Sequence, residues 1–314
     1  MRIVFCGSGM LAVPALQVLQ ETEHELVAVL TQPPRPAGRG LKPRPTLLAR
    51  QAEEMGLAAA PCLDINADDV VSSIGAAAPD VICVVDFGQI VRGPVRHCAR
   101  LDTINLHASL LPALRGAAPV NWAIIRGHEK TGVTIFSLVD AVDAGPVLAQ
   151  SATSIGPAET AEELKARLAG LGAKLLCRTL GLLAGSPPGR VEQDEAQATF
   201  APLLKKSDGI IDWGADAQAV RNRIHGTWPW PGGQSVLERS GAVGLPVIIA
   251  RAEVVDGEVQ GPPGSVDGQL CVATGAGRVR ILALKPAGKR LMAFKDFING
   301  YRVKAGDRFV GSGA

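Results

Sequence analysis

Residues 1–31 read MRIVFCGSGMLAVPALQVLQETEHELVAVLT, and this stretch decides the fold class of the N-terminal half. An apolar run at 3–6 is followed by a Gly-Ser-Gly turn, a helical pattern at 11–19 and a second apolar run at 25–30. A strand, a helix and a second strand in this order form the unit from which parallel sheets are built. The opening segment therefore predicts an α/β domain.

The same alternation of strand and helix patterns continues beyond this opening unit. Further apolar or β-branched runs lie at 81–85, 104–106, 133–138 and 147–155, and helical patterns lie at 46–55, 120–125 and 160–183. The last helix begins with a capping-box pattern at Thr160. We therefore predict a doubly wound, mostly parallel sheet in the N-terminal part of the chain.

The pattern changes after residue 185. The segment GSPPG at 185–189 is typical of a connector, because proline blocks helix continuation and glycine permits a turn. Short β-branched runs follow at 247–250, 269–273 and 279–284, with one helical stretch near 217–224. We predict an N-terminal domain at 1–185, a linker at 186–206 and a smaller, mainly β, barrel-like domain at 207–314.

Composition limits the classes of protein that the chain can belong to. The 314 residues are 47% hydrophobic and 20% charged, which is enough to build globular cores. No stretch approaches ~20 uninterrupted apolar residues, and the apolar run after Arg2 is broken by Gly7, Gly9 and Pro14, unlike a signal peptide. The six cysteines are scattered without a C-x-x-C pair, so we expect reduced, structural thiols in a cytoplasmic protein.

The net charge is only +2, but the basic residues are unevenly distributed. Residues 31–52 contain five basic and no acidic residues, and residues 278–308 contain nine basic and two acidic residues. Such regions suit a phosphate backbone, because each bound phosphate releases condensed counterions. Taken alone, they are equally compatible with an ordinary solvated surface.

A glycine-rich turn at residues 7–12, Gly-Ser-Gly-Met-Leu-Ala, satisfies the pattern G-x-G-x-x-A after a strand and before a helix. A dinucleotide site would also place an acidic residue at the end of the second strand, where this chain has Leu30-Thr31-Gln32. We interpret the glycines as permitting a tight turn and close packing rather than as a cofactor site.

The polar residues between Asp102 and Pro146 are unusual for a buried strand. Asn105 and His107 are two residues apart, so their side chains share one face at the C-terminal end of a predicted strand, where open α/β sheets bind ligands. Leu110-Leu111-Pro112 follows as a short apolar loop suited to a flat ring system, and Asp143 lies in a second loop. A lone buried histidine is more often structural, but this grouping predicts a functional site.

The pattern N-x-H-x-S-L-L-P with a later D-x-G resembles the formyltransferases that use 10-formyltetrahydrofolate. The resemblance extends over nearly the whole chain and is strongest to the members that formylate methionyl-tRNA. Six segments carry it: TQPPRPAGRG at 31–40, SLLPALRGAAPVNWAI at 109–124, TGVTIF at 131–136, IDW at 211–213, WPWPG at 228–232 and LKPAGKRLM at 284–292.

The resemblance implies a Rossmann-like N-terminal domain that binds folate and an OB-like C-terminal domain that grips tRNA. Its partners would be folate and initiator methionyl-tRNA, with no membrane partner, and the product would serve translation initiation; we expect a monomer. The implied catalytic residues are Asn105, His107 and Asp143. The implied folate contacts are Phe87, Gly88, Ser109, Leu110, Leu111 and Pro112. The implied tRNA contacts are Arg35, Arg39, Lys42, Lys289 and Arg290.

This chain departs from the family pattern at three places. Pro34 stands where the family commonly has Asp, Ser8-Gly9-Met10 replaces a Thr-Pro-Asp run, and Asp86-Phe87-Gly88-Gln89 replaces Ala-Tyr-Gly-Leu. These changes affect the basic loop and the expected pocket lining but leave the catalytic trio intact. The sequence therefore constrains the reaction more tightly than the details of the substrate.

The implied chemistry requires no metal. The α-amino nucleophile has a reference pKa of about 7.7–8.0, so much of it is neutral near pH 7. The larger demand is to stabilise negative charge on the formyl oxygen, which Asn105 and a protonated His107 could meet by donating hydrogen bonds. Asp143, directly or through a water molecule, could carry the surplus proton of the amine to the leaving nitrogen.

Four alternatives remain at this level. They are a formyltransferase acting on a small amine such as an amino sugar or glycinamide ribotide, a hydrolase that releases formate, a tRNA-binding protein without catalysis, and an oxidoreductase. The basic regions argue against the first two and the polar trio against the third. The missing acidic residue argues against the fourth.

Overall fold

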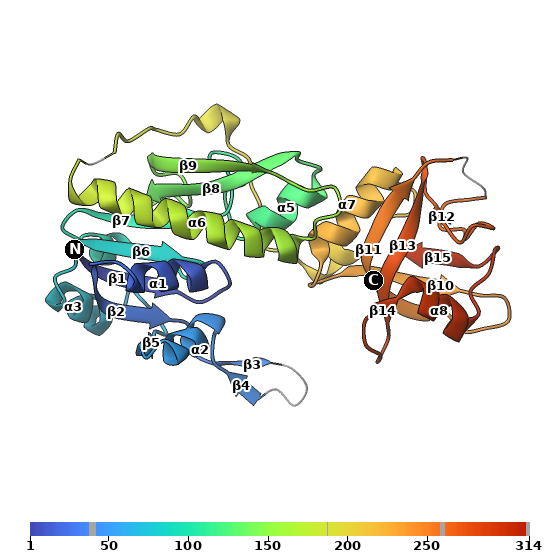
Figure 1. The fold of residues 1–314 in the computed structure, drawn as a ribbon, viewed down its shortest axis with the longest axis horizontal. Coiled ribbons are helices and arrows are strands. Elements are labelled where there is room, and N and C mark those ends of the chain that lie inside the picture. The colour runs from blue at the N-terminus through green and yellow to red at the C-terminus, as the bar shows by residue number, and fades with distance from the viewer. Residues whose placement is uncertain (38–41, 187, 258–260, 312–314) are drawn as a thin grey trace. The chain divides into compact units, whose positions relative to one another are not determined.

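The computed structural model describes residues 1–37, 42–186, 188–257 and 261–311. The described chain forms two compact units, whose elements are labelled in Figure 1. The first unit comprises Met1–Pro119, Thr131–Thr153 and Lys165–Ala201, and the second comprises Val120–Lys130, Ser154–Leu164 and Pro202–Ala314.

The first unit is built on a seven-stranded sheet with the order β5-β2-β1-β6-β7-β8-β9. Its strands are β1 (Arg2–Gly7), β2 (Glu25–Thr31), β5 (Ala59–Pro61), β6 (Val81–Val85), β7 (Asp102–His107), β8 (Lys130–Ser137) and β9 (Val147–Ser154). The first five of these pair in parallel, and β8 runs antiparallel to β7. The chain winds outward from β1 to β5 and then resumes at β6 on the other side, which confirms the predicted doubly wound, mostly parallel sheet.

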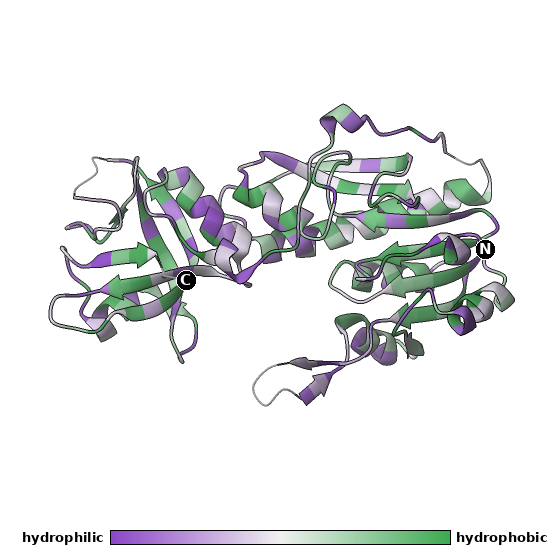
Figure 2. Ribbon diagram, turned by 180° about the vertical axis from the view of Figure 1, so that it is seen from behind, coloured by the Kyte–Doolittle hydropathy of each residue, from purple (hydrophilic) through white to green (hydrophobic). Residues whose placement is uncertain are grey.

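Helices cover both faces of this sheet, and its central strands are therefore continuously apolar. All five residues of β6 are buried, and Figure 2 shows the hydrophobic colouring of the strands. Ile74 and Val95 cover the face that carries Val84, while Gly172 lies against Leu106 on the opposite face. The helices are α1 (Ala12–Gln20), α2 (Leu47–Glu54), α3 (Asp68–Ala76), α4 (Gly93–Arg96) and α6 (Ala161–Ala184).

Two local features of the first unit bear on the predictions. A two-stranded hairpin that the sequence did not predict, β3 (Arg35–Ala37) with β4 (Lys42–Arg44), precedes α2. The segment after α6 contains a short 3₁₀ helix, η1 (Glu195–Gln197), and pairs with the rest of the first unit through backbone bridges from Val191 to Val147 and from Phe200 to Arg115.

The second unit contains a six-stranded antiparallel sheet with the order β12-β13-β11-β10-β15, in which β14 also pairs with β13. Its elements are α5 (Pro119–Ile125), η2 (Lys206–Gly209), α7 (Ala217–Thr227), β10 (Gly233–Glu238), β11 (Leu245–Val255), β12 (Val272–Ala273), β13 (Arg278–Pro286), β14 (Met292–Ala293), α8 (Phe294–Tyr301) and β15 (Arg308–Gly311). Single bridges from Ser265 to Arg308 and from Val266 to Val272 connect its two end strands. The sheet is therefore a nearly closed barrel, as predicted.

The capping box predicted at Thr160 is present. The Thr160 backbone N–H donates to the Glu163 carboxylate at 3.0 Å, and the Glu163 N–H donates to the Thr160 hydroxyl at 3.4 Å.

All six cysteines are free, and burial raises the pKa of the Cys6 and Cys83 thiols well above their usual range. Among the described residues, no helix has both the length and the apolar character needed to cross a membrane.

Candidate active site

His107 occupies the C-terminal end of β7 and is 7% exposed. Its Nε2 lies 3.0 Å from the backbone oxygen of Leu114, and the ring meets Phe136 edge to face. Because a carbonyl oxygen can only accept a hydrogen bond, Nε2 must carry a hydrogen and donate it. The other ring nitrogen, Nδ1, is therefore the one that can take part in chemistry.

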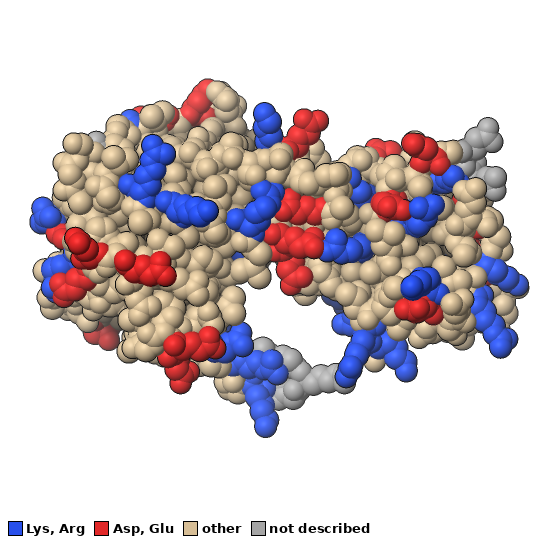
Figure 3. All heavy atoms as spheres, in the orientation of Figure 1, with Lys and Arg blue, Asp and Glu red and all other residues tan. Residues whose placement is uncertain are grey.

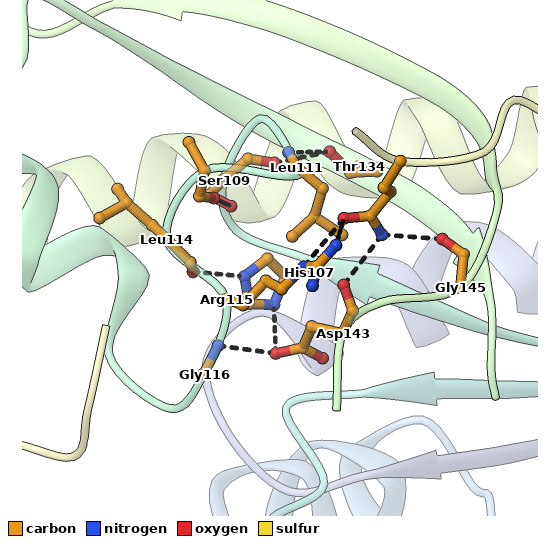
Figure 4. Close-up of polar contacts among 11 residues, drawn as sticks. His107, Ser109, Leu111, Leu114, Arg115, Gly116, Thr134, Asp143 and Gly145 are labelled. Atoms are coloured by element: carbon orange, nitrogen blue, oxygen red, sulfur yellow. Dashed lines mark hydrogen bonds and ion pairs between the residues drawn. The ribbon is translucent and has the colours of Figure 1, made fainter. Parts of the chain in front are cut away.

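The Asp143 carboxylate faces this second nitrogen (Figure 4). Its Oδ2 atom lies 3.8 Å from His107 Nδ1 and accepts a hydrogen bond of 2.7 Å from the backbone N–H of Gly116. The distance to the ring is too long for a direct hydrogen bond but short enough for electrostatic attraction when the ring carries a proton on both nitrogens. Asp143 has a φ of +52°, a backbone conformation that side-chain-bearing residues rarely adopt.

Asn105 shares the face of β7 that carries His107, since the two residues are two positions apart. It pairs with Val84 of β6, and both lie on the face of the sheet that α3 and α4 cover. Its side chain is half-buried, and none of the hydrogen bonds between described residues involves its amide. The structure thus places the predicted trio at one sheet edge, with the Asn105 amide available to a ligand.

The loop from Ser109 to Pro112 is held rigidly against the sheet. The Thr134 hydroxyl donates to Ser109 O at 2.7 Å and accepts from the Leu111 N–H at 3.1 Å, and Gln150 donates to Leu111 O at 2.8 Å. Leu110 and Pro112 are half-buried, whereas Ser109 and Leu111 are buried. Leu110 and Pro112 therefore provide the accessible apolar surface of this loop.

The predicted folate contacts Phe87 and Gly88 are arranged differently from the expectation. The Phe87 ring is 2% exposed and packs in the apolar core with Val91 and Val95, while Gly88 is exposed with a φ of +80°. Large exposed apolar side chains lie instead on the loops after β6 and β8: Ile90, Val139 and Val142. The sequence analysis missed these three. The position of Ile90 after the C-terminal end of the parallel strand β6 could have indicated it, whereas Val139 and Val142 follow the antiparallel strand β8 and have no such signal.

Basic residues surround a pocket of about 580 Å³ in the first unit. It is lined by Gln32, Pro33, Arg35, Arg44, Pro45, Thr46 and Arg50. The Arg35 guanidinium donates to the Gln32 side chain at 2.8 Å, and Thr46 is the N-cap of α2. Figure 3 shows the concentration of Lys and Arg side chains in this region. Arg44 and Arg50 were counted in the basic segment but not predicted as site residues.

The remaining predicted tRNA contacts are distributed as follows. Lys42 is exposed on β4, and Arg39 lies outside the described residues. Lys289 and Arg290 are exposed in the turn between β13 and β14 of the second unit.

The glycine-rich turn at 7–12 is filled by the protein itself. A Cβ atom on Gly7 would lie 2.6 Å from Ala12 Cβ, and one on Gly9 would lie 2.0 Å from Asp86 Oδ2. Lys165 Nζ pairs with this carboxylate oxygen at 2.9 Å. A negative charge thus lies against the turn where a dinucleotide phosphate would bind, so close packing accounts for both glycines.

Comparison with known proteins identifies the class to which this fold and site belong. The "Formyl transferase" model matches residues 1–180, and the "Formyl transferase, C-terminal domain" model matches residues 203–302. The two matches define a formyl transferase with both domains of the class.

Curated relatives narrow this class. A methionyl-tRNA formyltransferase from Geotalea uraniireducens is 40% identical over 311 residues, covering 98% of this chain and 97% of that protein. One from Methylococcus capsulatus is 41% identical over 312 residues, covering 98% and 99%. The chain belongs to the methionyl-tRNA formyltransferase family.

Solved structures share the fold at low sequence identity. HypX from Aquifex aeolicus in complex with tetrahydrofolic acid matches with a TM-score of 0.64 and 19% identity, over 96% of this chain and 47% of that one. An N-formyltransferase from Helicobacter canadensis, in complex with folinic acid and dTDP-3-aminofucose, matches with a TM-score of 0.63 and 13% identity, over 92% and 99%.

Proposed function

We propose that this chain transfers the formyl group of 10-formyltetrahydrofolate to the α-amino group of methionyl-tRNA, which yields N-formylmethionyl-tRNA for translation initiation. The observation that carries the chemistry is the Asp143 carboxylate 3.8 Å from Nδ1 of His107, on the face shared with the Asn105 amide. Family membership supports the reaction and its acceptor, and the geometry supports a role for each residue.

His107 and Asn105 would stabilise the negative charge that develops on the formyl oxygen. The hydrogen on Nε2 of His107 is committed to Leu114 O, so the donor to the formyl oxygen is Nδ1–H. A ring with hydrogens on both nitrogens is a cation, and the nearby Asp143 carboxylate offsets its charge. The Asn105 side-chain N–H supplies the second donor, and two such donors suit an oxyanion.

Asp143 would also receive the surplus proton. After attack, the amine nitrogen carries one proton too many, and the folate nitrogen must gain one as it leaves. Because Gly116 N–H holds Oδ2 in place, the carboxylate stays within reach of the reacting atoms while it relays that proton directly or through a water molecule.

The apolar surfaces support binding of a flat folate ring system. Leu110 and Pro112 are half-buried on a clamped loop, and Ile90, Val139 and Val142 expose large apolar side chains on the two loops after β6 and β8. Exposed apolar groups at the edge of a sheet commonly mark a ligand surface. We infer that these residues, rather than the buried Phe87 ring, contact the folate.

The basic pocket would bind phosphates of the tRNA. Three arginines, Arg35, Arg44 and Arg50, converge on it from β3, β4 and α2. A small amine acceptor needs no such pocket, whereas a polynucleotide gains affinity from each neutralised phosphate.

The proposed arrangement assigns residues 1–185 to the catalytic, folate-binding domain and 207–314 to an OB-like tRNA-binding domain. Residues 186–206 connect the two, and this connector packs with the first unit as far as Ala201. One chain carries the trio, the apolar loops and the basic pocket, so no residue from a second copy is required. We accordingly propose that the protein acts as a monomer in the cytoplasm.

The decisive assay mixes purified protein with 10-formyltetrahydrofolate and either methionyl-tRNA or a nucleotide-linked amino sugar, and measures formylated product. We expect formylmethionyl-tRNA and no formylated sugar. Formylation of the sugar alone would identify a small-amine formyltransferase, and release of formate without transfer would identify a hydrolase.

Replacing Arg44 or Arg50 with alanine tests the basic pocket. Each change should weaken binding of methionyl-tRNA and reduce the slope of log Kd against log salt by roughly 1, because one phosphate contact is lost. Folate affinity should not change. Arg178→Ala, which removes an exposed arginine of α6, is the matched control. An unchanged salt slope in both pocket variants would exclude phosphate binding there.

A further inference from the structure

Gln193 connects the segment after α6 to the loop that carries Asp143. Its amide Nε2 donates to the backbone oxygens of Asp143, at 2.9 Å, and Gly145, at 2.7 Å. Its Oε1 accepts from Nε and Nη2 of Arg115, at 3.0 and 2.8 Å. Both hydrogens and both lone pairs of the amide are therefore used.

Arg115 fixes the orientation of this amide. The guanidinium belongs to a residue that is only 4% exposed, and two of its remaining donors form a two-pronged pair with Glu195, at 2.9 and 2.7 Å. Hydrogen bonding to Arg115 holds the pKa of the Glu195 carboxyl below its usual range. An arginine offers only donors, so it must face Oε1 of Gln193, and the amide nitrogen must then point at the Asp143 loop.

The Asp143 backbone needs such a restraint. Its φ of +52° costs conformational energy and persists only where surrounding contacts impose it. Gly116 N–H holds the carboxylate and Gln193 holds the carbonyl of the same residue. Because Gly116 follows Arg115 in the chain, both restraints originate from one assembly, in which the buried Arg115 joins the half-buried Gln193 and the exposed Glu195.

The same segment also supports the partner of His107. Leu114, whose oxygen accepts from His107 Nε2, has a φ of +62°, and its N–H donates to the Thr199 hydroxyl at 2.9 Å. The Arg115 N–H donates to Thr199 O at 2.8 Å. The two residues with left-handed backbones beside His107 are thus both tied to the stretch from 193 to 199.

We propose that Gln193 is a positioning residue for Asp143: its amide holds the loop so that the carboxylate faces His107 Nδ1. The inference rests on the proposed formyl transfer for its kinetic consequences. Its structural consequence, a fixed Asp143 loop, can be measured without any assay of activity.

The kinetic test compares Gln193→Ala with Gln193→Glu. A displacement of about 1 Å can lower the rate by on the order of 10²-fold, so we expect kcat to fall about 10- to 100-fold in both, with KM for methionyl-tRNA within about twofold. The Glu variant keeps an acceptor for Arg115 but directs a carboxylate oxygen at two carbonyl oxygens. Gln197→Ala is the matched control, since Gln197 is an exposed glutamine of the same segment that contacts only Asp194 among the described side chains.

A double-variant cycle separates positioning from general stability. If Gln193 acts through the Asp143 carboxylate, Gln193→Ala should change kcat by less than about twofold in an Asp143→Asn background. Full additivity of the two losses would overturn the proposal even if both variants fold normally.

Hydrogen exchange provides the readout that does not depend on formyl transfer. Amides of residues 139–145 should exchange faster in Gln193→Ala than in the original protein or Gln197→Ala, while those of β1 and β6 stay unchanged. Unchanged exchange at 139–145 would overturn the positioning role. Failure of the original protein to formylate methionyl-tRNA would instead overturn the proposed function and leave this measurement decisive for the loop.

Discussion

Replacing His107 with alanine is expected to lower kcat for formyl transfer by about 10²–10³-fold, while the affinity for methionyl-tRNA stays within about twofold. The ring supplies the one Nδ1–H donor between the Asp143 carboxylate and the reacting centre, and its other nitrogen is occupied by Leu114 O. Alanine removes that donor and leaves the basic pocket of the first unit unaltered. The loss should therefore appear in the chemical step and not in tRNA binding.

Single-turnover formylation at saturating methionyl-tRNA, together with tRNA binding by fluorescence, measures the two quantities separately. His107→Asn is a graded variant, because the asparagine amide nitrogen can occupy nearly the position of Nδ1 and donate without a positive charge. It should retain more activity than alanine. His97→Ala, at an exposed histidine, should have no effect. Equal losses of rate and tRNA affinity in His107→Ala would show that the ring binds substrate rather than stabilising charge.

The sheet of the first unit could be predicted because its signals are local. Buried parallel strands such as β1 and β6 are continuous apolar runs, and the helices between them carry their own periodicity. The elements that were missed have weaker signals. β5 has three residues with little burial, and the β3–β4 hairpin contains two prolines, which argue against a strand.

The barrel of the second unit was predictable as a class but not in its closure. β11 and β13 show β-branched runs, whereas β10, with the sequence GQSVLE, contains glycine and polar residues and gains its strand conformation by pairing on both sides. One of the two bridges that connect the end strands joins Ser265 to Arg308, which lie far apart in the sequence. Such long-range pairing has no local signature.

The candidate site, too, could be predicted only in part. Asn105 and His107 could be predicted from the sequence because a spacing of two on a strand fixes a shared face. The proline-rich segment after residue 185 predicted a linker, so nothing marked Gln193 or Glu195 as partners of Arg115, which is about eighty residues earlier. In the sequence, a residue that only positions another looks like any exposed polar residue. Its role can be recognised only from the hydrogen bonds that it makes in the folded structure.

Asp143→Asn should reduce kcat about 10²–10⁴-fold, the usual contribution of a positioned proton-transfer group. Asparagine is nearly the same shape, and its Oδ1 can still accept the hydrogen bond from Gly116 N–H, so the loop should keep its conformation. What disappears is the negative charge facing His107 and the ability to take the surplus proton of the amine. The two losses act on one step, and their combined effect should exceed that of removing either donor to the formyl oxygen alone.

Asp140→Asn provides the matched control, because Asp140 belongs to the same loop but is exposed and pairs only with Arg96 among the described residues. Its variant should remain within about twofold of the original kcat. Thermal unfolding should be unchanged in Asp143→Asn, and hydrogen exchange at 139–145 should match that of the original protein, unlike in Gln193→Ala. If Asp143→Asn lost activity only because its loop became mobile, the carboxylate would be a structural cap. If the variant is inactive while its loop exchanges hydrogen as in the original protein, the function of Asp143 is to supply negative charge and to transfer a proton.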